Sequence, residues 1–357
     1  MDTCKLYVGC DTGNGLTKVA LADDNGDLKV IKYPSYVIQV PSGDVVTGTY
    51  GNLSNGAIIT YVNGPRKELV NTSWLLGNTA YINFPDTRRA VVESNDGKVL
   101  YGLQLFLGSL AIAGFASMDS LQINLCVSVH NKSAFQQAIV EAYSGFHEIK
   151  VAESNKAIRV DISTTCVEEG RGTMYYLMLK GIITPDTPLA GLIDLGDGTT
   201  RASMYTVGTK SFTVIPESVK VTNTGVRNLL RRMANHISLT EPLQGKVDQE
   251  IIRVSLEKSS KNGMYYGNTT LELTEAYQAC VKEWVDSSVR PAISALDAWK
   301  AVAAIYTIGG GTQLPGVEKL LYTPNKLTGR ARFNITPEPQ LSNAIGMASA
   351  VKRMVKV

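Results

Sequence analysis

Apolar and polar residues alternate, or form short apolar runs, over the first thirty or so positions of the chain. The runs at 6–10, 17–22 and 28–33 hold the Val, Ile, Leu and Tyr content that is typical of strands. A Gly-rich turn separates the first two, and Asp24-Asn25-Gly26-Asp27 separates the second from the third. Such turns allow the tight reversal of an antiparallel hairpin. The pattern therefore predicts three antiparallel strands.

The pattern changes after Pro34. Residues 34–95 are rich in Asn, Gly, Thr and Tyr and lack a helical period, which predicts a small strand-rich insertion. Beyond it, helical spacing predicts helices over 99–118 and 132–143. Apolar runs predict strands over 121–129, 147–151 and 158–162, and these elements complete a first α/β domain. The apolar stretch at 103–118 is too short and too polar for a membrane span and predicts a buried core helix.

The second half of the chain alternates strands and helices in the same way. Helices are predicted over 173–180, 224–237, 247–258 and 273–300, the last interrupted at Pro291, and apolar strands over 190–195 and 301–308. In the 224–237 helix, Thr224 or Asn223 is the expected N-cap, and Arg227, Arg231 and Arg232 lie opposite an apolar face that runs from Val226 to Ile237. A final helix over 342–354 carries Ala344, Gly346 and Ala348, small residues that permit close helix packing.

One short turn occurs twice. Residues 11–18 (DTGNGLTK) and 194–201 (DLGDGTTR) align without gaps, share Asp, Gly, Gly and Thr, and place Lys18 opposite Arg201. Each copy follows a strand and precedes an alternating strand, a turn, a third strand and a Pro. The two copies are too far apart for a solenoid repeat and predict two similar domains. We expect residues 1–165, with the insertion and the C-terminal helix 342–357, to form domain I, and residues 166–341 to form domain II.

Composition narrows the function classes. The net charge of +3 is too small and too dispersed to indicate a nucleic-acid groove, so no direct nucleic-acid binding is expected. Five widely spaced cysteines and three histidines include no set at metal-ligand spacing, so we expect reduced, mostly structural thiols. Because no signal-peptide pattern opens the chain, a cytoplasmic location is the expectation.

The repeated turn has the chemistry of a phosphate site. Gly13, Gly15, Gly196 and Gly198 allow backbone N–H groups to line a concave turn, together with the intervening residues Thr12, Asn14, Asp197 and Thr199. Asp11 and Asp194 are suited to hold a hydrated Mg²⁺ that bridges phosphates, and Lys18 could reach the β-phosphate. Gly309, Gly310 and Gly311 follow a buried strand and would let a flat ring lie against bare backbone.

At this point the chain resembles the actin-like ATPase superfamily. Asp11–Lys18 is similar to its first phosphate motif, Asp194–Thr200 to its second, Ile305–Gly311 to its adenosine motif, and Asn343–Gly346 to its second connecting helix. Within the superfamily the chain is most similar to bacterial and archaeal actins of the plasmid-segregating ParM type. The resemblance implies an α/β actin-like (ribonuclease H-like) fold of two similar domains with a nucleotide cleft between them, and ATP or GTP with Mg²⁺ as cofactors.

The same resemblance implies an ATPase whose filaments assemble and disassemble with nucleotide hydrolysis. It implies self-association as the main partnership, an adaptor that links the filament to DNA or other cargo, and no membrane span. Its water-orienting acid corresponds to Glu169 or Glu168, and Gly225 to the segment that supports the ribose and base. These two acids join Asp11 and Asp194 as the expected catalytic residues.

Rival functions remain open from the sequence. A small-molecule kinase, of the sugar-kinase type, would need an aspartate base in the first domain, and Asp161 and Asp119 are available. A nucleotide-sensing scaffold would need no water-positioning acid. A chaperone would need a substrate-binding domain beyond residue 357, which the sequence lacks.

Overall fold

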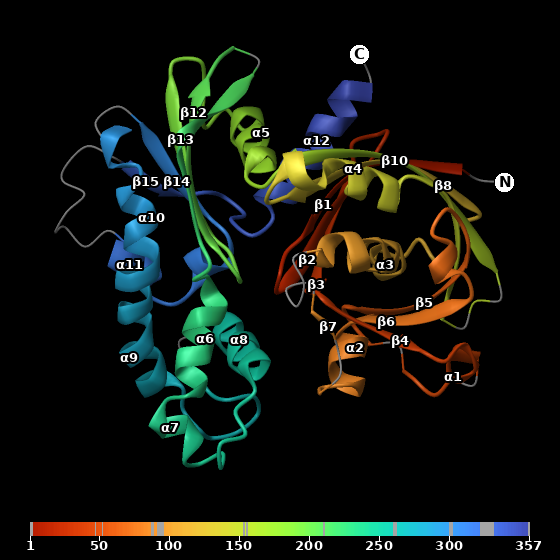
Figure 1. Ribbon diagram of the computed structural model, residues 1–357, viewed down its shortest axis with the longest axis horizontal. Helices are drawn as coiled ribbons and strands as arrows, with labels where there is room; N and C mark the ends of the chain where they lie inside the picture. Colours follow the sequence, from red (N-terminus) through yellow and green to blue (C-terminus); the bar gives the residue numbers. More distant parts are fainter. Residues whose placement is uncertain are drawn as a thin grey trace. The chain divides into compact units, whose positions relative to one another are not determined.

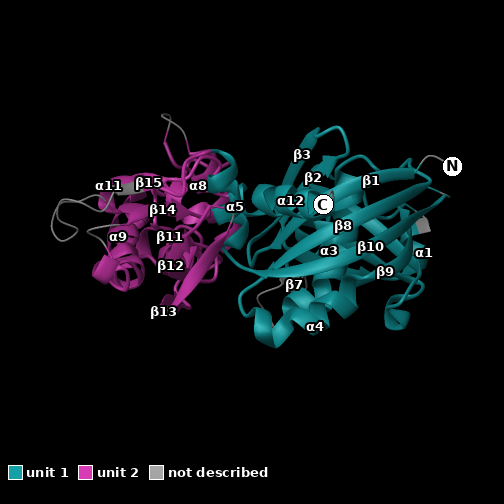
Figure 2. Cartoon of the chain, turned by 90° about the horizontal axis from the view of Figure 1, so that it is seen from above, with its two compact units in different colours: residues 1–180, 341–357 teal, residues 181–340 magenta. Residues whose placement is uncertain are grey.

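The chain divides into two compact units. The computed structural model describes residues 3–46, 48–51, 53–86, 89–90, 96–152, 154, 156–209, 211–259, 263–299, 303–321 and 332–355. Unit 1 comprises residues 1–180 and 341–357, and unit 2 comprises residues 181–340 (Figure 2). The boundary expected at residues 165/166 falls inside a continuous strand of unit 1, β10 (Ala157–Glu168), so that β10 and the following helix α5 (Arg171–Leu179) both belong to unit 1.

Unit 1 is built on one mixed sheet. In the described part of the chain its first five strands have the order β3 (Leu28–Pro34), β2 (Leu16–Asp23), β1 (Thr3–Thr12), β8 (Ser120–Val129) and β10. The first three are antiparallel, as the sequence predicts, whereas β1, β8 and β10 are parallel. Parallel strands place their carboxyl ends at one edge of the sheet, and that edge carries the candidate site described below.

The insertion continues the same sheet. The strands β9 (Gly145–Val151), β5 (Gly56–Asn63), β6 (Thr72–Gly77), β4 (Tyr36–Val40) and β7 (Arg89–Ala90) follow β10 in that order, each antiparallel to its neighbour. Two short helices, α1 (Ser42–Val46) and α2 (Asn78–Asn83), accompany these strands. The prediction of a strand-rich insertion is therefore confirmed for the described residues.

Helices cover both faces of this sheet. The sheet curves around α3 (Gly97–Ile112), which is largely buried in the core of unit 1, as the apolar pattern predicts (Figure 1). The helix ends earlier than residue 118 because Gly114 adopts a left-handed φ of 84° just beyond it. The helix α4 (Lys132–Tyr143) has the predicted bounds, since the Asn131 side chain caps it by accepting from the Ala134 N–H. The helices α12 (Ser342–Val355) and α5 cross each other on the other face.

Unit 2 repeats the five-stranded pattern. Its described strands have the order β13 (Phe212–Thr222), β12 (Thr200–Val207), β11 (Leu189–Leu195), β14 (Ala304–Ile308) and β15 (Arg332–Ile335). The orientations match those of β3-β2-β1-β8-β10 strand by strand. The register also matches, because Asp194 lies opposite Arg201 as Asp11 lies opposite Lys18. The sequence repeat therefore corresponds to a duplicated strand-turn-strand unit.

The helices of unit 2 pack around a second core that includes the fully buried Trp284. They are α6 (Val226–Ala234), α7 (Ile237–Thr240), α8 (Gln249–Lys258), α9 (Thr274–Trp284), α10 (Arg290–Ser294) and α11 (Val317–Leu321). A π-helical segment, Val285–Val289, joins α9 to α10, so Pro291 lies in the first turn of a new helix.

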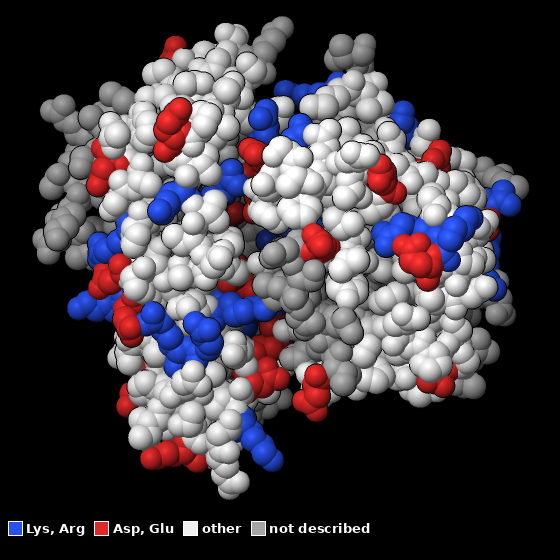
Figure 3. All heavy atoms as spheres, viewed as in Figure 1, with Lys and Arg blue, Asp and Glu red and all other residues white. Residues whose placement is uncertain are grey.

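The prediction for residues 224–237 was wrong at both ends. The N-cap of α6 is Gly225, which has no side chain to cap with, and the helix ends at Ala234. Ile237 begins α7 and is 61% exposed. The apolar face is confirmed for Val226, Leu229, Leu230 and Met233, and basic atoms gather over α6 in Figure 3.

Two general expectations concern thiols and membranes. Each cysteine is free: Cys10, Cys126, Cys166 and Cys280 are buried and Cys4 is partly buried. Among the described residues, no helix combines the length and the apolar character needed to cross a bilayer.

Candidate functional site

The first glycine turn joins β1 to β2 and is closed by its own backbone. The Gly13 N–H donates to the carbonyl oxygens of Asp11 and Leu16, at 3.0 Å each. A Cβ on Gly13 would lie 2.9 Å from the Leu16 oxygen, so the tight turn requires glycine at this position. Thr12 ends β1 opposite Thr17, and both are fully buried. Asn14 and Gly15 complete the turn.

Ser35, which the sequence analysis did not identify, holds this turn by hydrogen bonds to its backbone. Its hydroxyl donates to the Gly13 carbonyl at 2.7 Å, and its N–H donates to the Gly15 carbonyl at 3.0 Å. Its oxygen also lies 2.9 Å from the Thr17 hydroxyl. Ser35 is 1% exposed and follows Pro34 at the end of β3. Its place directly after the Pro that ends the repeated unit is the one sequence signal that could have drawn attention to it.

Asp11 lies in a largely buried polar network. Its Oδ2 is 3.3 Å from the Lys18 ammonium on the facing strand, and its Oδ1 accepts from the Ser128 hydroxyl at 2.9 Å. The Asn343 amide at the start of α12 in turn donates to the Ser128 oxygen at 3.2 Å. Burial alone would raise the pKa of the Asp11 carboxyl, but the Lys18 and Lys98 ammonium groups and the Ser128 hydrogen bond lower it to about 2. Asp11 is therefore an anion at neutral pH.

Lys98 connects Asp11 to the expected water-orienting acid. The Lys98 ammonium, at the start of α3, donates to Glu169 Oε1 at 2.8 Å and to the Ser128 carbonyl at 3.0 Å. Burial tends to lower the pKa of Lys98, but Glu169 and Asp11 raise it above its ordinary value, so the side chain stays cationic. The sequence analysis did not indicate Lys98 or Ser128, and it noted Asn343 only as the first residue of the segment similar to the second connecting helix.

The two acids differ in where they lie. Glu168 is the last residue of β10 and pairs with Val129 of β8. Glu169 follows it, donates its N–H to the Val129 carbonyl at 2.9 Å, and precedes Gly170, whose φ of 86° turns the chain into α5. Both acids therefore lie at the carboxyl edge of β1, β8 and β10, the edge at which Asp11 also lies.

The second glycine turn joins β11 to β12 and supports the start of α6. The Gly196 N–H donates to the Thr199 carbonyl at 3.0 Å, which matches the bond that Gly13 makes to Leu16. The N–H groups of Gly225, Val226 and Arg227 donate back to the carbonyls of Gly198, Gly196 and Asp197, at 3.2, 2.9 and 2.8 Å. The first N–H groups of a helix have no acceptor within the helix and often bond to a capping side chain. Here the carbonyls of the glycine turn accept those bonds instead.

Side chains strengthen this contact between turn and helix. The Arg227 guanidinium binds the Asp197 carboxylate at 3.0 Å, and the Trp284 indole donates to the carbonyls of Thr224 and Gly225. A Cβ on Gly225 would lie 2.4 Å from the Asp197 carbonyl oxygen. Asp197 and Gly225 therefore have structural roles in the turn, whether or not they also contact a ligand.

The glycines after β14 lie against Asp194. A Cβ on Gly309, where φ is 87°, would be 2.4 Å from Asp194 Oδ1, and a Cβ on Gly311 would be 2.7 Å from the Leu195 Cβ. Gly310 begins a short 3₁₀ turn whose Thr312 hydroxyl donates to the Gly309 carbonyl at 2.7 Å. Asp194, the second glycine turn and the third glycine motif thus meet at the carboxyl ends of β11 and β14.

The residues present fit a hydrated divalent cation with phosphates. Asp11 is ionised and Asp194 offers a second carboxylate, and carboxylate oxygens are the ligands Mg²⁺ prefers. Among the described residues no cluster of three or more His, Cys, Asp or Glu side chains forms an all-protein metal cage. A Mg²⁺ held by Asp11 in unit 1, or by Asp194 in unit 2, would therefore keep water and phosphate oxygens among its ligands.

Comparison with known proteins identifies the fold. No protein-family model matches the chain, and a search of curated protein sequences finds no match. Solved structures do match. An archaeal actin homologue, Ta0583, has a TM-score of 0.70 and 16% identity over 98% of this chain and 99% of its own. Bacillus thuringiensis ParM with ATP has a TM-score of 0.71 and 14% identity over 99% of this chain and 100% of its own.

A third match is a structure of an assembly. A 15-stranded ParM filament from Clostridium botulinum has a TM-score of 0.68 and 16% identity, over 99% of this chain and 100% of its own. TM-scores of 0.68 to 0.71 over nearly the whole chain show the fold, and at 14–16% identity they show the fold alone. Together with the duplicated strand-turn-strand unit, they show that the chain has an actin-like α/β fold similar to that of the ParM proteins.

Proposed function

We propose that the chain is an actin-like ATPase that binds ATP with Mg²⁺ and polymerises into filaments. The observation that carries the proposal is the duplicated turn: each unit presents an aspartate and a glycine turn in the same register at the carboxyl ends of its parallel strands. The similar B. thuringiensis ParM was solved with ATP and the similar C. botulinum ParM as a filament, and both support the proposal.

Each residue has a role that follows from its position. The Gly13 and Gly196 N–H groups already close their turns by donating to the Leu16 and Thr199 carbonyls, which corrects the expectation that they bind phosphate. The N–H groups of Gly15 and Gly198, with those of Thr12, Asn14, Asp197 and Thr199, would bind phosphate oxygens. Lys18 would contribute a positive charge. Bound Mg²⁺ would neutralise phosphate charge, and Asp11 and Asp194 would hold it through its waters. The backbone of Gly309, Gly310 and Gly311 would support the base, with Gly225 on the ribose side.

Glu169 is the better placed of the two acids to orient an attacking water. Lys98 holds its carboxylate at 2.8 Å and connects it to the strand that carries Ser128, the partner of Asp11. A carboxylate fixed by a buried cation keeps one orientation, which positioning of a water requires. Glu168, one residue earlier, ends β10 and remains the alternative.

Filament formation determines the cellular role. We propose that hydrolysis destabilises a head-to-tail polymer, since a contact whose rotation does not close generates a filament. An adaptor would link the polymer to a plasmid, other DNA or another cargo in the cytoplasm. GTP could replace ATP, because the phosphate contacts do not distinguish the two bases.

The small-molecule kinase has weaker support from the positions of its two candidate bases. Asp119 immediately precedes β8, at the amino end of the strand, where it binds Lys156. Asp161 pairs in register with Gln122 of β8, which pairs with Lys5 of β1, six residues before Asp11. At about 3.3 Å per residue, that register puts Asp161 about 20 Å along the sheet from the phosphate turn.

Sedimentation and phosphate release test the proposal together. The protein should pellet with ATP-Mg²⁺ above a critical concentration and release phosphate, and Asp11→Ala and Asp194→Ala should abolish turnover. Glu169→Ala should slow hydrolysis by about 10² to 10⁴ while nucleotide still binds, so its filaments should persist. Wild-type turnover in both aspartate variants would contradict the site. Rapid phosphorylation of a sugar without any polymer would favour the kinase.

A further inference from the structure

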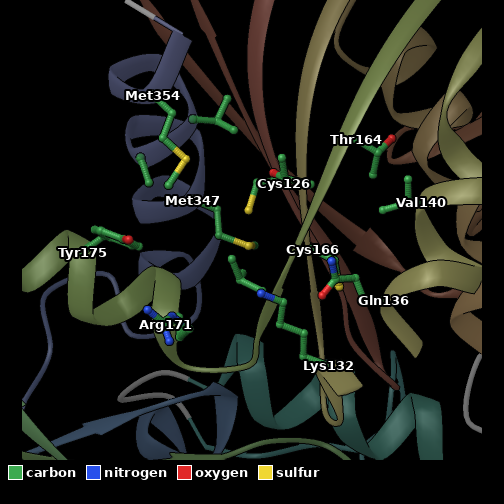
Figure 4. Close-up of a pocket in the computed structure, with 14 residues that line it drawn as sticks. Cys126, Lys132, Gln136, Val140, Thr164, Cys166, Arg171, Tyr175, Met347 and Met354 are labelled. Atoms are coloured by element: carbon green, nitrogen blue, oxygen red, sulfur yellow. The ribbon is translucent and has the colours of Figure 1, made fainter. Parts of the chain in front are cut away.

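A cavity of about 560 Å³ in unit 1 lies beside the last residues of β10. Figure 4 shows Met347, Met354 and Tyr175 on one side and Thr164, Val140 and Gln136 on the other, with strands passing between them. The lining thus comes from α12 and α5 on one face of the sheet and from α4 on the other. The cavity therefore extends around the edge of β10 to both faces of the sheet.

The last residues of β10 have a neighbouring strand on one side only. β9 pairs with β10 as far as Ile162, opposite Gly145, whereas β8 continues beside β10 to Glu168. Over residues 163–168 the described part of the chain therefore supplies a neighbouring strand on the β8 side alone. The unpaired N–H and C=O groups of a strand edge can pair with another chain, and native proteins normally keep such edges short, cover them or block them.

The backbone groups of alternate residues point to this open edge. The N–H groups of Arg159 and Glu169 donate to the Asp119 and Val129 carbonyls, on the β8 side. Because successive residues of a strand point their N–H and C=O groups to opposite sides, Thr164 and Cys166 point theirs away from β8. The Thr164 hydroxyl is also buried and has no hydrogen-bond partner among the described residues.

The side chains around the edge define the chemistry of a partner. Met347, Met354 and Val351 give one wall an adaptable apolar surface. The lining residues include two basic side chains, Lys132 and Arg171, and no aspartate or glutamate. An extended segment with apolar residues on one face and carboxylates near its ends would match both features.

We propose that the edge of β10 at residues 163–168 is a docking site for an extended acidic segment of another protein, which adds to the sheet as a further strand. Its backbone pairs with Thr164 and Cys166, its apolar side chains contact Met347 and Met354, and a carboxylate binds Lys132. Strand addition of this kind takes affinity from main-chain bonds and specificity from alternate side chains.

A defined probe tests the proposal on the whole 357-residue protein without nucleotide. A fluorescein-labelled eight-residue peptide that alternates Val with Glu should bind saturably in an anisotropy titration. Hydrogen exchange should then show new protection of the Thr164 and Cys166 amides, whereas the Thr165 amide, which faces β8, should not change. A copy of the peptide N-methylated at alternate residues, and a copy with Lys in place of Glu, should not bind.

Two charge-reversal variants test whether peptide binding depends on a cation at the cavity or on the charge of the protein in general. Lys132→Glu should weaken peptide binding about tenfold or more, whereas Lys150→Glu, on β9 outside the cavity, should leave it unchanged. Absence of saturable binding at millimolar peptide would overturn the proposal. Binding that survives N-methylation would also overturn it, in favour of a ligand held by the cavity alone. Protection of the same amides by self-association without peptide would assign the edge to a second copy of the chain instead.

Discussion

Asp11 shows how a charge can be kept at a buried position. Its side chain is 13% exposed, yet Lys18, Lys98 and Ser128 stabilise the anion more than burial destabilises it, and the pKa falls to about 2. A carboxylate that is already ionised and hydrogen-bonded needs no rearrangement to receive a hydrated cation. The same partners make Asp11 a contributor to stability as well as to the proposed chemistry.

The pKa shift of Asp11 predicts a pH dependence of folding. The pKa is lowered from 3.8 to about 2 in the folded state, so the carboxylate stabilises the protein above the unfolded pKa and loses this contribution as the pH falls through the folded value. Between about pH 4 and pH 2, the free energy of unfolding should fall by roughly 2 kcal/mol more in the wild type than in Asp11→Asn.

Urea denaturation at a series of pH values measures this difference. Asp27→Asn, a change at an exposed carboxylate in the β2–β3 turn, is the matched control and should follow the wild-type curve. Parallel curves for the wild type and Asp11→Asn would show that the lysines do not hold the Asp11 charge in the way described.

The Lys98–Glu169 pair predicts strong coupling between two residues far apart in the sequence. Their side chains are 12% and 22% exposed, so Lys98→Met leaves a largely buried carboxylate without its cation and should cost about 3 kcal/mol of stability. Adding Glu169→Gln should recover part of that loss, with a coupling of about 1 to 2 kcal/mol in a double-mutant cycle. The more exposed Lys156–Asp119 pair should show a coupling below about 1 kcal/mol. Additive effects at Lys98 and Glu169 would mean that the pair does not act as a unit.

At the scale of elements, the crossing of α5 and α12 depends on missing side chains. A Cβ on Gly346 would lie 1.7 Å from the Gly172 carbonyl oxygen, and a Cβ on Gly172 would lie 2.1 Å from the Asn343 carbonyl oxygen. The backbones therefore touch, and this contact places Asn343 beside Ser128. Of the small residues that the sequence pattern singled out in the last helix, Gly346 meets α5, whereas Ala344 and Ala348 pack against Ala20 of the sheet.

This contact predicts that replacing Gly346 destabilises the protein more than replacing a glycine that has open space around it. Gly346→Ala should lower the free energy of unfolding by about 1 to 3 kcal/mol, because the new methyl group meets backbone that cannot move aside. Gly43→Ala, in α1 where a Cβ would have no heavy atom within 4 Å, should be neutral or stabilise by up to about 1 kcal/mol. Thermal unfolding of both variants measures the difference. Equal effects would indicate that the α5–α12 crossing tolerates a wider separation than the structure has.

The elements also show which features a sequence can predict. The bounds of α4 follow from its own residues, since Asn131 caps it through a bond three residues away. The start of α6 does not, because its donors are satisfied by carbonyls of a turn about 30 residues earlier. The Asp11–Ser128–Asn343 network joins residues 117 and 215 positions apart, and no periodicity or motif reports such contacts. Repeated local motifs predicted the two turns, whereas Ser35, Lys98 and Ser128 required the tertiary structure.

At the scale of the molecule, each unit has its own hydrophobic core and its own glycine turn. Each unit therefore carries one copy of the strand-turn-strand unit, and a ligand that needs both turns, as the proposed function requires of ATP-Mg²⁺, would make folding of each unit depend on the other. Ligand that binds only the native state stabilises it by mass action, by about 2.7 kcal/mol at one hundred times the dissociation constant. Units with separate cores can unfold in separate steps, and a shared ligand would couple those steps.

Calorimetry on the protein below its assembly threshold gives the whole-molecule prediction. ATP-Mg²⁺ should raise the unfolding temperature of both units, or merge two transitions into one, whereas in Asp194→Ala the same nucleotide should raise neither by as much. The reason is that phosphate charge left uncompensated in unit 2 weakens a ligand that unit 1 also needs. Asp186→Ala, an aspartate variant in the same unit eight residues before Asp194, is the control and should respond as the wild type does. If ATP-Mg²⁺ stabilises one transition alone, and does so equally in the wild type and Asp194→Ala, then the second glycine turn is a structural copy of the first and not half of a shared nucleotide site.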